Sequence, residues 1–223
     1  MSMNFGSKDG ILIRTMTVED YKQIDESVYS GEPLISCFEK EIKEIYEARR
    51  SKFDDYHISL IEKGDCLVAI NENDNGRIVG LVLAFGKVPS DLVEEHKWIT
   101  QMPASPLKRI MMFNYEGRAK ANLFERYGVS KLIYSHITNV NASMRGRGIG
   151  TRLAAALMEL GRARGFPLMT AACSSFYSAR QKEALGMECV YSQAYADYKD
   201  DDGQVVFNPP APHTQLRILA IKL

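Results

Sequence analysis

The chain has 223 residues, of which 45% are hydrophobic and 25% are charged. This composition is typical of a soluble globular protein, and the length suffices for a packed core. A disordered chain, a collagen-like fibre and a membrane bundle are thereby excluded. Lys plus Arg and Asp plus Glu number 28 each, so the formal net charge is zero. Because proteins that bind nucleic acid usually carry a basic excess, we expect no nucleic-acid partner.

Sequence features of membrane or exported proteins are missing. No apolar run reaches the roughly 20 residues needed to cross a bilayer. The polar N-terminal segment does not resemble a signal peptide. The four cysteines, Cys37, Cys66, Cys173 and Cys189, are widely separated and form no Cys-x-x-Cys pair, which argues against a zinc or redox site. We therefore expect a cytoplasmic monomer with free thiols, no metal and no membrane contact.

Hydrophobic periodicity predicts the elements of the first half of the chain. Alternation over Ile11–Met16 predicts a strand, and Thr17 with Asp20 has the spacing of a capping box that opens a helix. After a break at 31–33, a second helix is expected from residues spaced three and four apart, namely Ile35, Phe38, Ile42 and Ile45. Three strands are then expected over Tyr56–Glu62, Cys66–Asn71 and Arg77–Phe85.

The second half alternates between expected helices and strands. A long helix over Pro106–Tyr127 is expected to end at Gly128. The elements that follow are a strand over Lys131–Val140, a helix over Gly150–Arg164, a strand over Pro167–Cys173, a helix over Ser178–Leu185, and strands over Met187–Tyr198 and Thr214–Lys222. This order indicates one α/β domain over residues 1–223, antiparallel at first, with a parallel strand–helix–strand unit late in the chain.

The segment that joins Lys131–Val140 to the next helix is rich in Gly and Arg. Backbone N–H groups at a helix start bind anions, and glycines let a phosphate come close. Residues 145–164 hold five arginines and one acid, so positive charge gathers near this loop. Neither Gly-Lys-Ser/Thr of a Walker loop nor Gly-x-Gly-x-x-Gly of a dinucleotide site is present. The pattern is instead Arg-x-x-Gly-x-Gly, at Arg145, Gly148 and Gly150.

With a strand before it and a helix after it, this pattern resembles the acetyl-CoA loop of the GNAT superfamily of N-acetyltransferases. The resemblance implies a mixed, mostly antiparallel sheet with a splayed parallel pair and helices on both faces. It also implies acetyl-CoA as cosubstrate, a binding core at about residues 130–190, and a backbone N–H of Asn139 or Val140 on the thioester carbonyl. The expected cofactor-binding residues are Ile137, Thr138, Asn139, Val140, Arg145, Gly146, Arg147, Gly148, Ile149, Gly150, Thr151 and Ser178.

Four other segments are similar to the insect arylalkylamine N-acetyltransferases, the group that contains dopamine N-acetyltransferase. They are Glu32-Pro33-Leu34, 173–180, Ala196-Asp197-Tyr198 and Pro210-Ala211-Pro212-His213. The resemblance implies acetyl transfer to the primary amine of an arylalkylamine, such as dopamine, tyramine, octopamine or serotonin, by direct attack in a ternary complex. The expected amine pocket consists of Tyr29, Pro33, Phe38, Met112 and His213.

The resemblance makes Glu32 the candidate general base, acting directly or through water. Apolar neighbours are expected to raise its pKa; the alternative is a helix-end acid beside Pro33. Ser174 and Ser178 resemble the serine pair near the thioester sulfur, although Ser178 could instead cap a helix that starts at Ala179.

His213 could line the amine pocket or relay a proton, or it could be a plain loop residue. Tyr177 is a second candidate for the general acid, and Cys173 is interpreted as a core residue. The spacing of His57, His96 and His136 suits no metal, and we interpret them as structural.

Other functions remain open at this stage. The same chemistry on a polyamine or agmatine would favour acids in the pocket. An aromatic substrate would favour apolar walls, as suggested by Tyr29, Phe38, Met111, Met112 and Phe113. A CoA-binding module without catalysis would not need the carboxylate of Glu32, and a protein acetyltransferase would need an open peptide groove.

Overall fold

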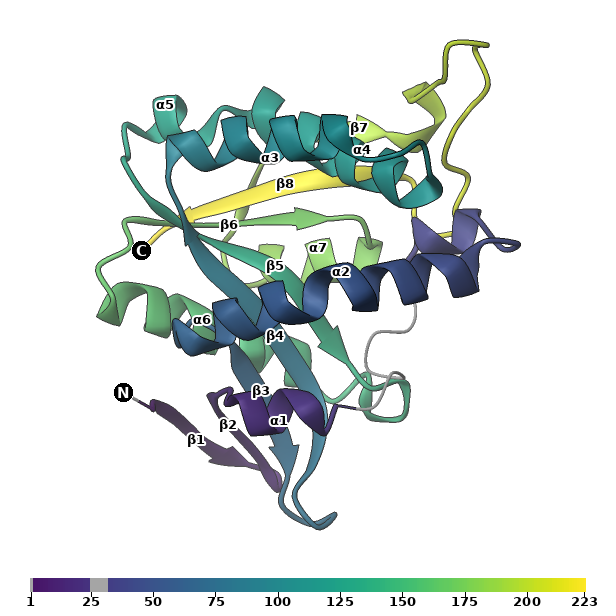
Figure 1. The fold of residues 1–223 in the computed structure, drawn as a ribbon. Coiled ribbons are helices and arrows are strands. Elements are labelled where there is room, and N and C mark those ends of the chain that lie inside the picture. Colours follow the sequence, from purple (N-terminus) through teal and green to yellow (C-terminus); the bar gives the residue numbers. More distant parts are fainter. Residues whose placement is uncertain (1, 25–31) are drawn as a thin grey trace.

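The residues described by the structure, a computed structural model, form an eight-stranded sheet in the order β1-β2-β3-β4-β5-β6-β8-β7 (Figure 1). These residues are 2–24 and 32–223, with the backbone alone described for 48–53. The strands are β1 Asn4–Lys8, β2 Ile11–Thr15, β3 Leu67–Asn71, β4 Arg77–Lys87, β5 Leu132–Val140, β6 Leu168–Cys173, β7 Glu188–Ala194 and β8 Gln215–Lys222. All neighbouring strands are antiparallel except β5 and β6, which confirms the expected mixed sheet.

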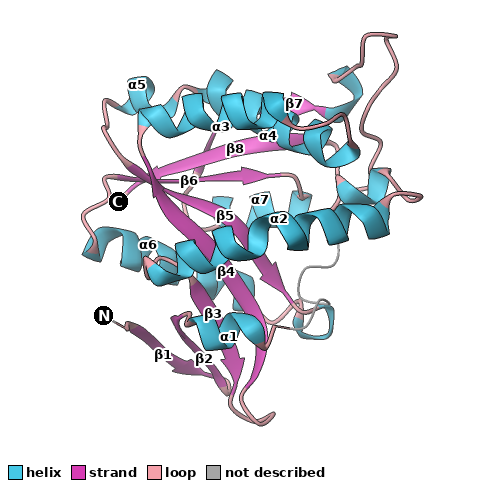
Figure 2. Cartoon of the chain, in the orientation of Figure 1, coloured by secondary structure: helices cyan, strands magenta, loops and turns pink. Residues whose placement is uncertain are grey.

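Helices cover both faces of this sheet, as expected (Figure 2). They are α1 Val18–Lys22, α2 Ile42–Glu62, α3 Pro89–Gln101, α4 Pro106–Ala121, α5 Leu123–Tyr127, α6 Ile149–Ala163 and α7 Phe176–Glu183. Short 3-10 turns lie at Ile35–Cys37, Ala142–Met144 and Tyr195–Asp197. Helices α2 and α4 pack on one face, and α6 with α7 packs on the other.

The core is divided by the sheet into two apolar layers. On the α2 and α4 side, Leu60 and Phe113 are buried against strand residues such as Leu81. On the α6 side, Leu153, Leu157 and Leu160 are fully buried. The two layers hold the sheet rigidly, which positions the ends of β5 and β6 for the site described below.

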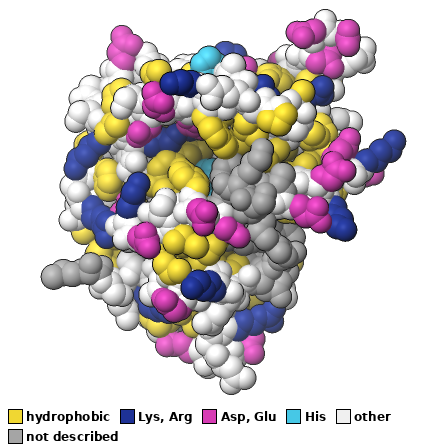
Figure 3. Space-filling model, in the orientation of Figure 1, with side chains coloured by type: hydrophobic (Ala, Val, Ile, Leu, Met, Phe, Trp, Pro, Cys, Tyr) yellow, Lys and Arg dark blue, Asp and Glu magenta, His cyan; other side chains and the backbone are white. Residues whose placement is uncertain are grey.

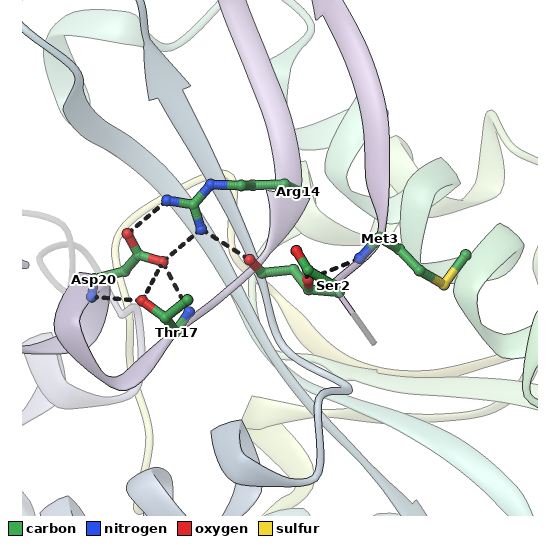
Figure 4. Close-up of polar contacts among 6 residues, drawn as sticks. Ser2, Met3, Arg14, Thr17 and Asp20 are labelled. Carbon is green, nitrogen blue, oxygen red and sulfur yellow. Dashed lines mark hydrogen bonds and ion pairs between the residues drawn. The ribbon is translucent and has the colours of Figure 1, made fainter.

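The predicted capping box at Thr17 and Asp20 is present and joins β2 to α1 (Figure 4). Arg14 donates two hydrogen bonds to the Asp20 carboxylate, at 2.6 and 2.8 Å. Burial alone would raise the pKa of Asp20, but the hydrogen bonds from Arg14 and Thr17 outweigh it and lower the pKa. Nearby, Thr15 Oγ1 accepts the N–H of Met3, so the N-terminal segment is held against β2 (Figure 4).

Two expectations for the first half are wrong, and two elements were not expected. Residues Tyr56–Glu62 are the last turns of α2 rather than a strand, because His57, Leu60 and Ile61 are buried at helical spacing. The helix expected from Pro33 begins only at Ile42, after a short 3-10 turn. Strand β1 and helix α3 were not anticipated from the periodicity.

The second half departs from expectation at two places. The expected helix over Pro106–Tyr127 is divided at Asn122, which has a left-handed backbone with φ 44°. The end at Gly128 is confirmed, since Gly128 is also left-handed. Ser178 does not cap a helix, because α7 begins at Phe176 and its N-cap residue is Ser175.

Charges are interspersed over the surface, with acidic and basic side chains mixed on the face drawn in Figure 3. In the described part of the chain, no helix combines the length and the apolar character needed to cross a membrane. Within the same residues, no group of three His, Cys, Asp or Glu side chains could hold a metal ion. The thiols of Cys37, Cys66, Cys173 and Cys189 are free.

Candidate active site

Strands β5 and β6 separate part of the way along their length, as the expected splayed pair requires. Their pairing joins Ile133 to Met169, Tyr134 to Thr170 and Ser135 to Ala171, and ends there. Beyond that point β5 stays paired with β4 as far as Val140, with an irregularity of the register at His136. The far half of β5 therefore presents its other side to a gap in the sheet.

Alternation along β5 decides which backbone groups face this gap. The N–H of Val140 bonds to the Asn139 side chain at 2.9 Å, and the Val140 carbonyl accepts Arg145 Nε at 3.1 Å. The N–H of Asn141 instead bonds to Val79 of β4. Since antiparallel residues alternate in direction, Val140 and Thr138 face the gap, whereas Asn139 faces β4. Of the two amides considered for the thioester carbonyl, Val140 has the suitable direction.

A cavity of about 740 Å³ opens at this gap. Most of the residues expected to bind acetyl-CoA line it, namely Ile137, Thr138, Asn139, Val140, Arg145, Gly146, Gly148, Ile149, Gly150, Thr151 and Ser178. The side chain of Arg147 is exposed and is not among the lining residues in the described part of the chain. One continuous space therefore connects the loop, the splayed strand and helix α7.

The residues expected to act on the amine divide into those that reach the cavity and those that do not. Glu32, Pro33, Ser174, Ser178 and His213 all line it, although they are far apart in sequence.

The remaining predicted pocket residues lie elsewhere. Phe38 is partly buried and packs against the core residue Phe207, at 6.0 Å between ring centres. Met111 lines the cavity instead of Met112, because successive helix residues point in different directions. Tyr29 lies outside the described residues.

The loop before α6 has the form of an anion-binding site. Gly146 and Gly148 have φ of 79° and 72°, a conformation that side chains disfavour. A Cβ built on either would meet no atom of the described chain within 4 Å, so the space above the loop is open. Gly148 is the N-cap of α6 and provides no side-chain cap, which leaves the first N–H groups of the helix available to a ligand.

The arginines that follow the loop are less concentrated on the site than the sequence indicated. Arg152 donates to the carbonyls of Lys8 and Ile11 and so holds the N-terminal hairpin. Arg164 is bound to Asp65 at 2.9 Å, on the far end of α6. Arg145 lines the cavity and adds its positive charge to that of the nearby N-terminus of α6.

Glu32 is held at the cavity wall by the short turn that follows it. Its carbonyl accepts the N–H groups of Ile35 and Ser36, at 3.1 and 3.3 Å. Leu34 and Ile35 are buried at 0% and 3% exposure, so they anchor the turn in the core. The Glu32 side chain remains half-buried and lines the cavity, a position that suits a base which must meet a substrate.

His213 lies against the first turn of α7, at the wall of the cavity. Its Nδ1 accepts the N–H of Phe176 at 3.2 Å, and its ring contacts Tyr177 edge-on at 5.8 Å. Burial lowers the pKa of His213, and the charge of Glu32 acts in the opposite sense. With Nδ1 used as an acceptor, the neutral ring carries its proton on Nε2.

The two serines occupy different surroundings on the floor of the cavity. Ser174 is buried, and its carbonyl accepts the hydroxyl of Tyr195 at 2.5 Å. Ser178 Oγ lies 3.0 Å from Lys182 Nζ and 3.5 Å from the sulfur of Cys173. Cys173 is 2% exposed, in agreement with its interpretation as a core residue.

A buried ion cluster at the inner end of the cavity was missed by the sequence reasoning. The carboxylate of Glu95 accepts bonds from Arg118, at 2.5 and 2.9 Å, and from Lys87 at 2.5 Å. Burial alone would raise the pKa of Glu95, but these two cations outweigh it and lower the pKa to about 2. The Arg118 guanidinium also lies over the Tyr134 ring, 5.0 Å from its centre.

Two histidines interpreted as structural also line the cavity, His57 and His136. His57 is 4% exposed, and its Nδ1 lies 2.8 Å from the hydroxyl of Tyr21. That hydroxyl donates to Asp54 at 2.9 Å. The strand expected over Tyr56–Glu62 would have directed His57 differently, whereas on α2 its side chain lines the cavity.

The family model described as Acetyltransferase (GNAT) family matches residues 32–181. The chain belongs to the GNAT acetyltransferase family. The matched range begins at Glu32 and ends at Gln181, so it includes the splayed strands and the glycine loop. As a GNAT N-acetyltransferase the protein uses acetyl-CoA, and the open loop, the uncapped start of α6 and the free side of β5 suit the phosphates and amides of that molecule.

Solved structures of other GNAT enzymes share the fold over nearly the whole chain. Arylalkylamine N-acetyltransferase 2 from Aedes aegypti is 23% identical, with a TM-score of 0.84, covering 96% of this chain and 99% of that one. The polyamine N-acetyltransferase of Drosophila melanogaster, which forms N-acetylagmatine, is 25% identical with a TM-score of 0.81, covering 96% and 100%. A mosquito arylalkylamine N-acetyltransferase-like 5b is 22% identical with a TM-score of 0.79, covering 96% and 100%.

Proposed function

We propose that this GNAT enzyme transfers acetyl from acetyl-CoA to the primary amine of an arylalkylamine, of the dopamine, tyramine, octopamine and serotonin class. The proposal rests on which carboxylates in the cavity are already bound by cations of the protein. Among the described lining residues, Glu32 and Glu95 are the carboxylates, and both oxygens of Glu95 are already bound by Arg118 and Lys87. One carboxylate, Glu32, is thus left for an incoming ammonium.

A substrate with two cations fits this arrangement poorly. Glu95, Arg118 and Lys87 carry a net charge of plus one when all are ionised, so their cluster repels a second cation at the inner end. An aromatic ring has no such charge. It would lie against the apolar side chains of α4 that line the cavity, Leu107, Ile110 and Met111, and near Tyr134.

The reaction uses groups on opposite sides of the gap. An alkylamine with a pKa of about 10 arrives protonated, and Glu32 accepts its proton directly or through water. The neutral amine then attacks the thioester carbon in a ternary complex, without an acyl-enzyme. The N–H of Val140 faces the gap, and it would stabilise the developing oxyanion once the carbonyl oxygen of the substrate replaces the Asn139 side chain that accepts it here. Ser174, Ser178 and His213 border the same space, where Ser178 would meet the leaving sulfur.

A second candidate is the same chemistry on agmatine or a polyamine. The likeness to the Drosophila melanogaster enzyme that forms N-acetylagmatine, at 25% identity, favours it. Such a substrate would have to place its second cation away from the ion cluster, toward the entrance.

The test is an amine panel with acetyl-CoA, monitored by release of the CoA thiol. We expect dopamine, tyramine and serotonin to give kcat/KM values at least about tenfold above agmatine and spermidine, the scale of one unfavourable charge contact. Pentylamine and cadaverine form a matched pair, because they differ chiefly in a terminal ammonium. Equal or better turnover of cadaverine and agmatine would replace the arylalkylamine assignment with the second candidate.

We further propose that residues 1–223 act as one catalytic domain, as a monomer in the cytoplasm. The continuous sheet, and a cavity whose described lining comes from both halves of the chain, support a single domain. Four free thiols support a reducing compartment. Size-exclusion chromatography with light scattering tests the oligomeric state.

A further inference from the structure

Lys182 is a buried cation with an unusual partner. Its side chain lies on α7 beneath the cavity and is 2% exposed, among the most buried large side chains of the described residues. Lysines are almost never fully buried unless they are paired. In the described part of the chain, the hydrogen bond given to its ammonium goes to the hydroxyl of Ser178, at 3.0 Å, and not to a carboxylate.

A merely structural role does not explain this ammonium. A leucine or methionine would fill similar space without the free energy needed to bury a charge. Arg14, Arg118 and Arg164 each meet a carboxylate where they are partly or wholly buried. Lys182 instead meets a neutral hydroxyl that lines the cavity. Among the described residues no carboxylate is paired with this charge, which lies one hydrogen bond away from the cavity.

The ammonium also decides the direction of the Ser178 hydroxyl. A protonated lysine has three donors and no acceptor, so Ser178 Oγ must accept from it. The hydroxyl hydrogen therefore points away from Lys182. It is donated to the sulfur of Cys173, 3.5 Å away. A thiol sulfur is a weak acceptor. A stronger one in the cavity, such as a thiolate, would take that hydrogen bond.

We propose that Lys182 is a positioning residue which, through Ser178, stabilises the CoA thiolate as it departs. The inference rests on the proposed function in that it takes the thioester sulfur to lie beside Ser178. When the tetrahedral adduct collapses, the C–S bond breaks and its electron pair stays on sulfur. The amine nitrogen loses two protons, one before attack and one as the adduct collapses, and each passes through Glu32 to water. Lys182 keeps its proton, and its charge strengthens the hydrogen bond from Ser178 to the sulfur.

The first test is a double-mutant cycle on Lys182→Met and Ser178→Ala. Each single variant should lower kcat about 10- to 100-fold, the range for one charge-assisted hydrogen bond, with little change in the KM for acetyl-CoA. The pair should be no worse than the worse single variant. Lys120→Met, an exposed lysine on α4, is the charge-matched control and should behave as wild type. Independent, multiplying losses would overturn the proposal.

The second test varies the leaving group. With para-nitrophenyl acetate as acetyl donor, the leaving phenolate needs little stabilisation, so the loss in Lys182→Met should nearly disappear. A loss as large as with acetyl-CoA would mean a general structural defect. Both tests use whichever amine of the panel the enzyme prefers, so a wrong assignment of the amine leaves them valid.

The third test needs no turnover. Ultraviolet absorbance of the thiolate during a pH titration reports the pKa of the CoA thiol in its complex with the enzyme. Wild type and Lys120→Met should bind CoA with a lowered thiol pKa, and Lys182→Met should lose that shift. Lys182→Gln, which keeps a donor but no charge, should be intermediate and serves if the methionine variant fails to fold. An unshifted thiol pKa in the wild type would overturn the proposal.

Discussion

The side-chain amide of Gln181 on α7 donates to the carbonyl of Gly150 in the first turn of α6, at 2.5 Å. This bond joins the helix that starts at the glycine loop to the helix that carries Ser178. It also occupies the space in which a side chain at position 150 would grow, since a Cβ there would lie 2.7 Å from Gln181 Oε1. In the Arg-x-x-Gly-x-Gly pattern, Gly150 is therefore required because the side chain of Gln181 leaves no room for a Cβ. Gly148 is required for a different reason, its left-handed backbone conformation.

Gly150→Ala should displace Gln181 and weaken the attachment of α7 to the loop. We expect the dissociation constant for acetyl-CoA to rise several-fold, measured by calorimetry on the folded variant. Adding Gln181→Ala removes the clash, so the double variant should bind more tightly than Gly150→Ala alone. If the second substitution instead weakens binding further, the contact with Gln181 is not what excludes a side chain at position 150.

Gly148→Val should raise the KM for acetyl-CoA strongly. Its φ of 72° strains a branched residue, and the new side chain would enter the open space above the loop. Gly128→Val is the matched control, because Gly128 has φ of 63° and a Cβ there also meets nothing within 4 Å. The control should lose similar stability but bind acetyl-CoA normally. Unchanged binding in Gly148→Val would contradict the role of the loop.

Glu32→Ala should lower kcat about 10²–10³-fold, in the usual range for removal of a general base. The bound amine would stay protonated, and raising the pH should partly restore the rate because hydroxide then removes the proton. The measurement is a pH–rate profile with a saturating amine, beside Glu39→Ala, an exposed acid of the same region, as control. Profiles of the same shape that differ less than about threefold would move the base elsewhere, first to His213.

His213 should act in its neutral form. Burial lowers its pKa below the ordinary value of 6.5, so the ring is largely uncharged at neutral pH. Protonation would remove the acceptor for the Phe176 N–H and place a cation beside the entering ammonium. We therefore expect kcat/KM to fall as the pH drops through this pKa, and His213→Gln to lack that part of the decline. Superimposable profiles of the two proteins below neutrality would exclude the effect.

Glu95→Gln should be one of the more destabilising single substitutions. It leaves Lys87 and Arg118 as buried cations without a counter-charge, a change that lowers the free energy of unfolding by about 3–5 kcal/mol. Urea unfolding measures it, with the exposed neighbour Glu94→Gln as control.

Because of Glu95, the free energy of unfolding is expected to decrease at acid pH. Folding lowers the pKa of Glu95 from 4.5 to about 2. Its contribution is therefore complete above pH 4.5 and is lost as the pH falls toward about 2. The Glu95→Gln variant should show a flatter dependence over this window. A wild-type stability that is level between these pH values would contradict the ion cluster.

Local patterns in the sequence predicted the elements whose chemistry is local. The capping box at Thr17, the strand before the loop and the end of a helix at Gly128 each depend on a few adjacent residues. Tyr56–Glu62 was misjudged because a short apolar run suits a strand or a buried helix face, and the contacts that decide between them come from β4 and α4.

The site was predictable where it follows a motif and unpredictable where it depends on packing. Glu32, Ser178 and His213 stand in recognisable segments, and the fold brings them to one cavity. Glu95 lies on α3, a helix that the hydrophobic pattern did not predict. Its place in the ion cluster depends on Arg118, which binds it from α4. Phe38 was misplaced because a turn, and not a helix, carries it away from the cavity.

The early end of the β5–β6 pairing gives the molecule an open strand edge in its interior. Exposed edges invite pairing with other chains and are a common route to aggregation. Here the edge lies within a cavity bordered by α4, α6 and α7, so an extended peptide strand with side chains on both faces would find little room. The narrow chain of amides and methylenes of acetyl-CoA can enter the cavity and lie along this edge. Acetyl-CoA bound along this edge should therefore raise the melting temperature, by an amount that grows with the logarithm of its concentration above the Kd, and should lower the tendency of the protein to aggregate on heating.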